Sequence, residues 1–529
     1  MKIRNNIYKL LALGLLATPI AFTSCSEDRM DEINFNPNNP TDVEAKFILA
    51  DVITATAVRS VGGDLNTYLS TYVEHEVGTH NQLWNAEHRD GEPQNATTFN
   101  NSWNSIYETI KNARIIVEKC SEGGQQEGNY TTLGVGQILL AYNMAILTDM
   151  YGDVPFSEAF DPFGNKTPKV DKQEAIYAQI LTLLNEAIVN IPKGDNHVTG
   201  GYSSHDLLFN GGATGNARWI KFANGLKARY TMRLLHVSAD KTQALEDVIE
   251  FVDASFVSSS EEASFNVYNA QNLNPLFDFQ WSRDGLAASQ SIADKMIERN
   301  DPRRNRNFTD ADLVQIADID DAYGDLAPNG ENDQIQYFYL TSTFVYSQTA
   351  STQLLSFHEL QFLKAEAMQR LGRSTADIEP VLKAAVEAAI VNSENSVKTA
   401  FVAPTPLAVL GIAVRETSPA ITSSDIDTYF EDEVKPLFLA DPLKEIAVQK
   451  YLAFFGASGE STEMYNDVRR WKALGDNLIE LKNPNNASKF PLRLPYGSSE
   501  TTTNPNVEAV YGNGTYVYSE NVWWAGGTR

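Results

Sequence analysis

Residues 97–120 read TTFNNSWNSIYETIKNARIIVEKC, and the spacing of their apolar residues predicts how the chain folds. The apolar positions recur at steps of three and four: Phe99, Trp103, Ile106, Tyr107, Ile110, Ala113, Val117 and Cys120. Such steps place side chains on one face of an α-helix, because a helix completes a turn in about 3.6 residues. The stretch therefore predicts an amphipathic helix with one buried face, on which Cys120 is a buried, inert thiol.

The same periodicity returns along most of the chain. After a loop at 121–130, SEGGQQEGNY, further helices are expected over 138–150, 176–191, 219–235, 354–372 and 378–390. Helices joined in this way form antiparallel pairs, in a pattern loosely like tetratricopeptide repeats. The spacing between the pairs is irregular, so inserted loops are expected rather than a regular array. The predicted fold class is predominantly all-α.

Three segments lack helical periodicity, namely 255–285, 300–352 and 480–529. They are rich in Asn, Asp, Gly, Tyr and Trp. We expect long loops with a few short strands in these segments, and long ordered loops are commonly where function lies.

The N-terminus has the layout of a secretory signal. Three basic residues lie in the first nine positions, and the apolar stretch Leu10–Phe22 follows them with 13 residues. A helix that crosses a membrane needs roughly 20 apolar residues, so this stretch is too short for a permanent span. Residues 1–24 are therefore predicted to be a signal peptide.

Cys25 directly follows two small residues, Thr23 and Ser24. This arrangement resembles a bacterial lipobox, in which the cysteine becomes residue one and is acylated; two or more acyl chains hold a protein stably on a bilayer. Residues 25–42, whose last part is rich in Asn and Pro, are predicted to be a lipidated N-terminus and tether. Ordinary cleavage near Ser24 is the alternative, but it would leave a reactive exposed thiol.

The charge of the chain excludes one class of partner. Removal of residues 1–24 takes away three basic residues and no acidic one, which leaves 39 Lys and Arg against 68 Asp and Glu and a net charge of −29. Such a surface repels nucleic acid and anionic membranes. We expect no nucleic-acid partner, and the acyl anchor must hold the protein on the membrane.

Residues 75–80, HEVGTH, superficially resemble a zinc-protease helix. The two histidines are five residues apart, which turns the second ring about 140° from the first on a helix, whereas a step of four nearly aligns them. A metal site made by His75, His80 and His88 is retained as an alternative to histidines with surface or capping roles. The acidic stretch Asp318–Asp325 raises the question of a calcium ion, but its glycine is one residue late for an EF-hand loop. We therefore expect no metal and no cofactor.

No catalytic motif stands out. Residues 456–459 lack the spacing of a nucleophile elbow, and no phosphate-loop lysine motif occurs. A glycosidase needs two carboxylates that face each other across a sugar bond, and nothing in the sequence singles out such a pair among the acids. We expect no catalytic residue.

Short motifs spread over nearly the whole chain carry a resemblance to a known family. They are YGDVPFSEA at 151–159; Trp219 with Phe222-Ala223-Asn224 and Arg233; Ala365-Glu366-Ala367 with Leu371-Gly372; Arg469-Arg470-Trp471; PLRLPY at 491–496 with Ser499-Glu500 and Asn504-Pro505; and Trp523-Trp524. In this order they resemble the SusD/RagB family of outer-membrane nutrient-binding lipoproteins from Bacteroidetes. Ala525 stands where one branch of that family has an acid. The acids after Cys25, Ser26-Glu27-Asp28, resemble the surface-export signal of such lipoproteins.

The resemblance implies one large helical domain over 43–529, held on the outer face of the outer membrane. It also implies a partner, a SusC-like TonB-dependent outer-membrane barrel, to which the protein delivers oligomers without changing them chemically. The motifs themselves have the character of scaffold: Pro155 stops a helix after a Gly-Asp turn, and Arg469 and Arg470 suit carboxylate pairing.

Ligand binding is expected to use exposed aromatic rings beside amides, because a flat ring covers the CH face of a sugar while amides and arginines bond its hydroxyl groups. Three polar segments offer such residues, and the first lies roughly where members of the family place part of their ligand site. The candidates are Asn81, Gln82, Trp84, Asn85 and Arg89; Trp281 and Arg283; and Tyr346 with Tyr337 and Tyr339. Each tryptophan has the alternative role of anchoring a loop to the core.

Two classes of function follow from these observations. The first is a non-catalytic protein that binds oligosaccharide, or oligopeptide, for import. The second is a surface glycoside hydrolase.

Overall fold

Helices dominate the computed structural model, which describes residues 42–161, 164–333, 335–402 and 412–529. This confirms the predicted fold class. The predicted signal peptide, Cys25 and nearly all of the tether lie outside the described residues. Residues 45–529 form one compact unit.

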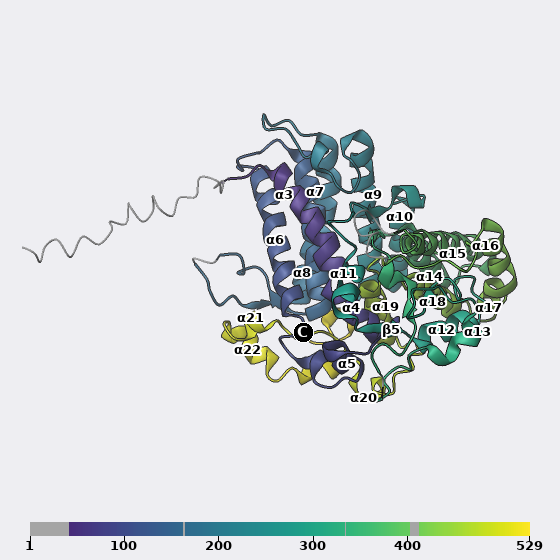
Figure 1. The fold of residues 1–529 in the computed structure, drawn as a ribbon. Helices are drawn as coiled ribbons and strands as arrows, with labels where there is room; N and C mark the ends of the chain where they lie inside the picture. The colour runs from purple at the N-terminus through teal and green to yellow at the C-terminus, as the bar shows by residue number, and fades with distance from the viewer. Residues whose placement is uncertain (1–41, 162–163, 334, 403–411) are drawn as a thin grey trace, which may run out of the picture. The chain divides into compact units, whose positions relative to one another are not determined.

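The first long helices are α3 (Ala45–Ala55), α4 (Asp64–Tyr72), α6 (Asn100–Cys120), α7 (Tyr130–Tyr151), α8 (Gln173–Asn190), α9 (Gly212–Arg233) and α10 (Lys241–Asp253), with a π-helix, η2 (Thr56–Val61), between α3 and α4. Successive helices pack against each other, α6 on α7, α7 on α8, α8 on α9 and α9 on α10 (Figure 1). The contacts of α6 with α7 and of α8 with α9 are those of two predicted pairs. The apolar stripe of α6 is buried as expected, and so is Cys120, whose thiol pKa burial raises to about 12.

Helix α7 is long and apolar enough to cross a membrane by length and composition alone, but its residues are buried inside the fold. It contacts α6 on one side and α8 on another, and also α3 and α9. It is therefore the central helix of this half of the compact unit, and its apolar sequence is explained by burial.

The second group of helices comprises α14 (Phe357–Arg370), α15 (Thr375–Lys398), α16 (Ser423–Tyr429), α17 (Lys435–Ala440), α18 (Pro442–Ala453) and α19 (Ser461–Leu474), with a π-helix, η11 (Phe430–Val434), after α16. Helix α14 pairs with α15 as predicted and also packs on α10 and α18. The sequence-based prediction did not name α10, α18 or α19. In α18 almost every residue is buried, so the helix has no polar face to generate a clear period.

The remaining elements are short. The helices are α5 (Asn81–Glu87), α11 (Pro275–Arg283), α12 (Gln290–Ile297), α13 (Ile319–Ala322), α20 (Asn486–Lys489), α21 (Ser498–Thr501) and α22 (Pro505–Tyr511). The prediction of loops with short strands was wrong for residues 480–529, where the structure has short helices. It was also wrong for residues 275–283, which form α11.

Short strands form four two-stranded antiparallel sheets among the described residues. The pairs are β1 (Glu76–Gly78) with β5 (Leu286–Ala288), β2 (Val154–Pro155) with β3 (Val170–Asp171), β4 (Ala263–Phe265) with β8 (Thr352–Leu355), and β6 (Phe308–Thr309) with β7 (Thr341–Ser342). Strands β4, β6 and β7 lie within the segments where short strands were predicted, and β8 begins at the end of one of them. The β1–β5 and β2–β3 pairs lie outside those segments and were not predicted.

Buried ion pairs tie α14, α18 and α19 together. Arg470 on α19 donates two hydrogen bonds to the two carboxylate oxygens of Glu366 on α14, both at 2.7 Å. Trp471 adds an Nε1 hydrogen bond to the same carboxylate at 3.1 Å. Asp467 pairs with Lys450 of α18 at 2.6 Å. Burial alone would raise the pKa of Glu366, but Arg470 and the neighbouring cations outweigh burial and hold that pKa far below its usual range.

A second cluster of ion pairs ties α9 into the same core. Arg229 on α9 pairs with Glu359 of α14 at 2.6 Å. One turn later, Arg233 pairs with Glu463 of α19 and lies 3.4 Å from Asp149 of α7. These arginines, like Arg470, belong to or adjoin the sequence motifs that were expected to be scaffold, and the structure places them in the core.

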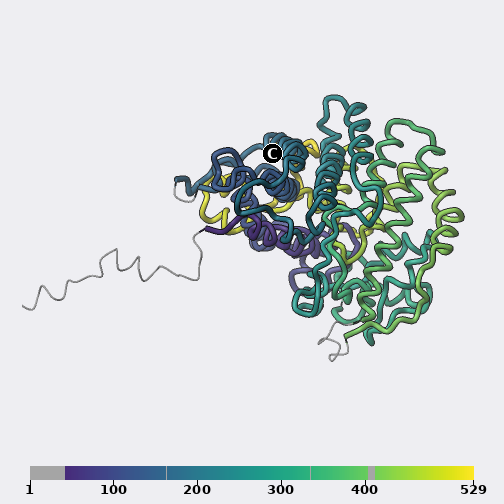
Figure 2. The backbone as a smooth tube through the Cα atoms, turned by 90° about the horizontal axis from the view of Figure 1, so that it is seen from above, coloured from purple at the N-terminus to yellow at the C-terminus, as the bar shows by residue number. Residues whose placement is uncertain are grey.

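The C-terminal segment closes the end of α7. Gly152 follows that helix with φ of 76°, and a Cβ atom there would lie 2.7 Å from the guanidinium of Arg493, so only glycine fits. Tyr496 donates to the carbonyl oxygen of Asp153 at 2.7 Å, while the Asp153 carboxylate accepts from the backbone of Gln173 at the start of α8. The yellow C-terminal segment consequently lies beside the blue and purple N-terminal helices in Figure 2.

We predict that Glu366→Gln destabilises the fold by about 3–5 kcal/mol, because it leaves the buried guanidinium of Arg470 without its main counter-charge. Urea denaturation measures the loss. The matched control is Glu246→Gln, which breaks an exposed ion pair with Arg373 and should change stability by about 1 kcal/mol or less. Equal effects of the two substitutions would contradict the assignment of the buried pair as a central constraint.

Candidate functional site

The pairing of β1 with β5 brings two of the three candidate segments together. Glu76 lies opposite Ala288 and Gly78 opposite Leu286, and the backbone of Thr79 donates to the carbonyl of Gly285 at 2.9 Å. Strand β1 leads almost directly into α5, and β5 directly follows α11. Helices α5 and α11, nearly two hundred residues apart in sequence, are therefore held beside the same small sheet.

The third candidate segment is hydrogen-bonded to residues beside the same small sheet. The side-chain amide of Gln336 donates to the carbonyl of Asp284 at 2.7 Å, and the backbone of Ala288 donates to Leu340 at 2.8 Å. Nε2 of His88 lies 2.7 Å from the carbonyl oxygen of Glu331. The stretch that contains Tyr337, Tyr339 and Tyr346 is thus anchored against both α5 and α11.

Trp84 and Trp281 lie on short helices, whereas the sequence had been interpreted as polar loops. Helix α11 begins at an Asn-Pro pair: the side chain of Asn274 accepts from the backbone of Leu276 and caps the helix, and Pro275 occupies its first turn. Helices of seven and nine residues are too short to show a period. The Asn274-Pro275 pair was the available signal for α11.

Several predicted side chains line one small pocket. Asn81 and Gln82, at the exposed start of α5, face Arg283 at the end of α11, with Phe279 between the helices. The cavity volume is about 40 Å³. Among the described residues the guanidinium of Arg283 has no hydrogen-bond or ion-pair partner. It is exposed, and so it is available to a ligand.

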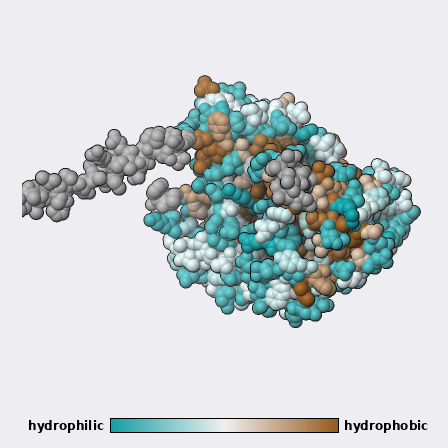
Figure 3. All heavy atoms as spheres, viewed as in Figure 1, coloured by the Kyte–Doolittle hydropathy of each residue, from teal (hydrophilic) through white to brown (hydrophobic). Residues whose placement is uncertain are grey.

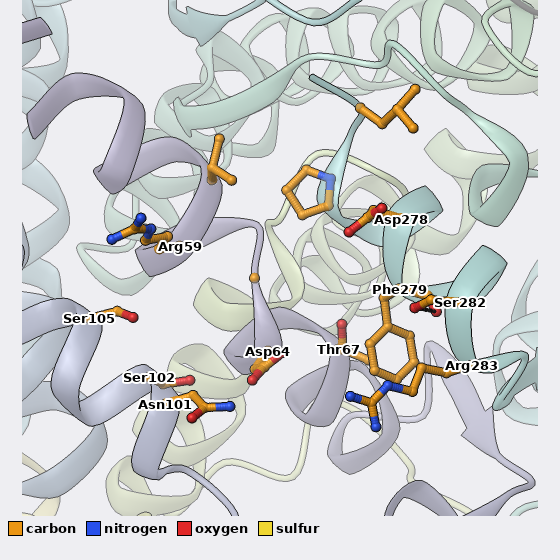
Figure 4. A pocket seen from close by; sticks show the side chains of 14 residues that line it. Arg59, Asp64, Thr67, Asn101, Ser102, Ser105, Asp278, Phe279, Ser282 and Arg283 are labelled. Atoms are coloured by element: carbon orange, nitrogen blue, oxygen red, sulfur yellow. Dashed lines mark hydrogen bonds between the residues drawn. The ribbon is translucent and has the colours of Figure 1, made fainter. Parts of the chain in front are cut away.

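A larger cleft adjoins this pocket, because Phe279 and Arg283 line both (Figure 4). Its volume is about 370 Å³, within the range of pockets for small ligands. Arg59, from η2, lies across the cleft from Asp278 and Arg283 of α11 (Figure 4). Ser102 of α6 lines the cleft, and its hydroxyl is buried without a hydrogen-bond partner within the described part of the chain.

Arg59 and Ser102 were not identified from the sequence. Arg59 follows an apolar helix and stands in a run of mostly buried residues. Its charge was the only feature of the sequence that could have marked it as a site residue. Ser102 falls between the apolar positions of α6, where a small polar residue is unremarkable. Only the crossing of α4, α6 and α11 reveals that these side chains share a cleft.

Aromatic rings lie on the same three segments, although the ring that lines both the pocket and the cleft is Phe279. Trp281 is 55% exposed and stacks on Phe277, with ring centroids 6.1 Å apart and an angle of 11° between the rings. Trp84 is half-buried and stacks on His88 at 3.9 Å. Tyr337 is 72% exposed. Because Trp281 and Tyr337 expose much of their apolar surface, only part of each ring contributes to core packing, and the rest can contact a ligand.

Tyr346 and Asn85 are half-buried, and Tyr346 lies close to the end of α11. Burial raises the pKa of the Tyr346 hydroxyl, and the charge of Asp284 raises it further. The hydroxyl accepts a weak hydrogen bond from Thr341 at 3.4 Å. The exposed Phe338, beside Tyr337, was not selected from the sequence and adds a further ring to this segment.

Arg89 is not on this surface. Its side chain is fully buried, donates to the carbonyl of Ala86 at 2.6 Å and to Asn486 at 2.9 Å, and lies over the ring of Tyr72. The prediction of Arg89 as a ligand contact was therefore wrong. Its guanidinium forms hydrogen bonds that join the end of α5 to the C-terminal segment. Arg89 lies two residues beyond the end of α5 with a φ of 56°, and its side chain points toward the core, which the sequence of the segment did not reveal.

The three histidines serve structural contacts. His75 is buried and bonds Ser461 and the carbonyl of Tyr451, whereas His88 bonds the carbonyl of Trp84. His80 bonds its neighbour Asn81. Within the described ranges no group of three His, Cys, Asp or Glu side chains could hold a metal ion. In the acidic stretch, Asp318 caps α13 by accepting from the backbone of Asp320.

Two buried carboxyl groups lie beneath the candidate surface. Glu76 on β1 accepts from Ser342, and Glu87 at the end of α5 accepts from the backbone of Gly330 and the side chain of Asn483. Burial raises the pKa of each carboxyl group to about 8. Both groups are therefore mostly neutral in the folded protein at pH 7.

We predict that these carboxyls weaken the fold as pH rises from about 4.5 to 8, because the unfolded chain releases their protons at lower pH than the folded chain. Glu87→Gln keeps an oxygen for Gly330 and cannot ionise. The stability of the Glu87→Gln variant should fall less than that of the wild type across this pH range. At pH 9 the variant should be the more stable protein. Thermal unfolding at a series of pH values measures the difference, with the exposed Glu387→Gln as control. Identical slopes in wild type and Glu87→Gln would show that Glu87 ionises normally.

Comparisons of the sequence and of the structure with known proteins point to the same family. The sequence model of the SusD-like proteins, described as starch-binding and associating with the outer membrane, matches residues 37–496. A SusD/RagB family protein from Bacteroides thetaiotaomicron has a solved structure that is 48% identical, with a TM-score of 0.85; the match covers 92% of this chain and all of that chain. Among curated proteins no match is found.

More distant solved structures share the fold. A chitin-binding protein is 21% identical, with a TM-score of 0.66, over 91% of this chain and all of its own. An outer membrane protein from Bacteroides vulgatus, described as probably involved in nutrient binding, is 17% identical, with a TM-score of 0.68, over 91% of this chain and all of its own. These two likenesses concern architecture alone.

Proposed function

The chain belongs to the SusD-like family of nutrient-binding proteins associated with the outer membrane, and from this we propose that it binds oligosaccharides at the cell surface and passes them to a TonB-dependent transporter. In this proposal the protein is a lipoprotein anchored through Cys25. It captures its ligand without catalysis.

The observation that carries the proposal is that helix α11 carries both an exposed ring, Trp281, and a guanidinium unpartnered among the described residues, Arg283, which lines the cleft and the adjoining pocket. Trp281 offers a flat ring that is 55% exposed, and a sugar presents a matching apolar CH face. Arg283 and the amides of Asn81 and Gln82 supply hydrogen bonds to hydroxyl groups a short distance away. A sugar has both kinds of surface, so a site that offers both kinds of contact suits it.

The lining of the cleft favours binding over hydrolysis. Its two carboxylates are Asp64 and Asp278, and Asp278 is exposed to solvent. A glycosidase requires a general acid whose pKa is raised by its surroundings, usually by burial away from water. Glu76 and Glu87, whose pKa burial raises, lie behind the surface and bond scaffold groups.

The N-terminal sequence and the family together support the proposed localisation at the outer membrane and the proposed transporter partner. A short apolar stretch before Cys25 supports export and acylation, and the acids after it support surface display. The lower part of the face seen in Figure 3, over which α5, α20 and α22 lie, is mostly hydrophilic, as suits a surface in contact with water. Since the net charge is strongly negative, the proposed lipid, not the protein surface, would hold the protein on the membrane. A SusC-like barrel is the proposed recipient of the ligand.

We predict that Trp281→Ala weakens oligosaccharide binding about thirtyfold with little change in melting temperature, because the ring is exposed and its loss costs contact with the ligand but little core packing. Trp84→Ala should weaken binding and also lower the melting temperature, because that ring is half-buried against His88. Calorimetric titration with starch and chitin oligosaccharides, acidic glycans and peptides measures affinity, and thermal unfolding measures stability.

The matched control is Trp523→Ala, a half-buried tryptophan on η13 (Trp523–Ala525), which packs against α8 and α19. It should lower the melting temperature without changing affinity. If the protein binds peptides and no glycan, the ligand is an oligopeptide and not an oligosaccharide. Release of reducing ends from a bound glycan, abolished by Asp64→Asn or Asp278→Asn, would establish the hydrolase instead.

We predict that Cys25→Ala moves the protein from the outer-membrane fraction to a soluble fraction, because it removes the acylated atom. Mass spectrometry of the wild-type N-terminal peptide should find acyl chains on Cys25. A matched Cys120→Ala variant removes the other cysteine and should stay membrane-bound. If Cys25→Ala remains in the membrane fraction and the wild-type peptide carries no acyl chain, the anchor does not exist.

A further inference from the structure

A second, larger cavity has no residue in common with the cleft or its adjoining pocket. It is a groove of about 580 Å³ between the start of α9, the β4–β8 sheet and the C-terminal half of α15. Its lining is dominated by serine, threonine, asparagine and glutamine side chains, and it contains no aromatic ring. The groove therefore differs in chemistry from the candidate site, whose cleft and pocket are both lined by the ring of Phe279.

Gln353 on β8 presents an unused acceptor in this groove. The residue is 4% exposed, and its Nε2 donates to Glu262 at 3.1 Å and to Asn392 at 3.2 Å. The orientation of the amide is fixed, because both neighbours are acceptors and Glu262 is itself held by the backbone of Phe357 at 3.1 Å. The Oε1 atom is buried and has no partner in the part of the chain that the structure describes. A buried acceptor without a donor is unfavourable and uncommon, so a ligand hydroxyl would satisfy it.

Arg218 on α9 presents an unused donor in the same groove. The side chain is half-buried, and within the described residues it makes no hydrogen bond or ion pair. Glu261 is influenced by the charge of Arg218, but its carboxylate is held by Lys221 at 2.6 Å. In a chain of formal net charge −26, a guanidinium left without a carboxylate partner is available to a ligand.

The acidic side chains of the groove are already occupied. Asp206 accepts from the backbone of Leu208, Phe209 and Gly211 and from the indole of Trp219. The two oxygens of Glu262 accept from Gln353 and from the backbone of Phe357. Two acids against one guanidinium leave the groove without excess positive charge to attract an anion, and because both acids are already bonded to scaffold groups they do not select a cation.

We propose that this groove is a second saccharide site, which binds a short neutral sugar through its hydroxyl groups without aromatic stacking; the proposal rests on the proposed function in that the protein is taken to bind saccharides. A sugar hydroxyl both donates and accepts, so it can donate to Gln353 Oε1 and accept from Arg218. The volume lies within the range of small-molecule sites. Two separate sites on one protein would hold a chain that reaches both more tightly than either site alone.

The test is calorimetric titration of the full-length protein with maltose and with N,N′-diacetylchitobiose, accompanied by saturation-transfer NMR of each sugar. Wild type should show two classes of site. Arg218→Gln should weaken the second class at least tenfold, and Ser264→Phe, which fills the groove from β4, should abolish it. Arg415→Gln is the matched control, because Arg415 is exposed and lies outside both the cleft and the groove. It should leave both classes unchanged.

The two proposals fail in different ways. A single class of site that is lost in Trp281→Ala and unaffected by Arg218→Gln overturns the second site and keeps the proposed function. A single class lost in Arg218→Gln and unaffected by Trp281→Ala keeps the groove and overturns the aromatic cleft. Absence of binding by the wild type overturns both. If Ser264→Phe fails to fold, Arg218→Gln decides the question, because a half-buried arginine without partners can be replaced at little cost in stability.

Discussion

The rest of the structure depends on a set of ionised side chains buried where five helices meet. Arg470 and Glu366 form its centre, and Arg233 with Glu463 extends it to α9 and α7. Two charges removed from water are tolerated only when each meets its partner with good geometry, and an unpaired one is strongly destabilising. The helices can therefore pack in only one register, and the apolar stripes then fill the space around these pairs.

A fixed helical frame explains why the candidate site can be built from short elements. Helices of seven and nine residues, such as α5 and α11, would not be stable alone in water. Strands β1 and β5 hold them, and Arg89 with Asn486 ties α5 to the C-terminal segment. Rings such as Trp281 can then remain exposed, because the frame and not the ring holds the element in place.

The two cavities differ in the surfaces that they offer. The cleft beside α11 combines the ring of Phe279 with the guanidinium of Arg283, unpartnered in the part of the chain that the structure describes, which suits the apolar face and the hydroxyl edge of a sugar together. The groove beside β8 offers only polar groups, among them a fixed amide oxygen on Gln353 and a free guanidinium on Arg218. The residues that line either cavity can change without disturbing the buried charges, since neither cavity is lined by Arg470 or Glu366.

The sequence by itself determined the helical class, the long helices and the motifs that build the core, because helical periodicity is a local property and buried charges appear as short fixed patterns. It also selected the three segments that meet at the candidate site, from their exposed types of residue. Only the tertiary structure decided that these segments meet, that α5 and α11 are helices, that Arg89 faces inward and that Arg59 and Ser102 share the cleft. Each of these depends on contacts between residues far apart in the chain, such as Gly78 with Leu286, and a single sequence carries no signal of which distant residues will touch.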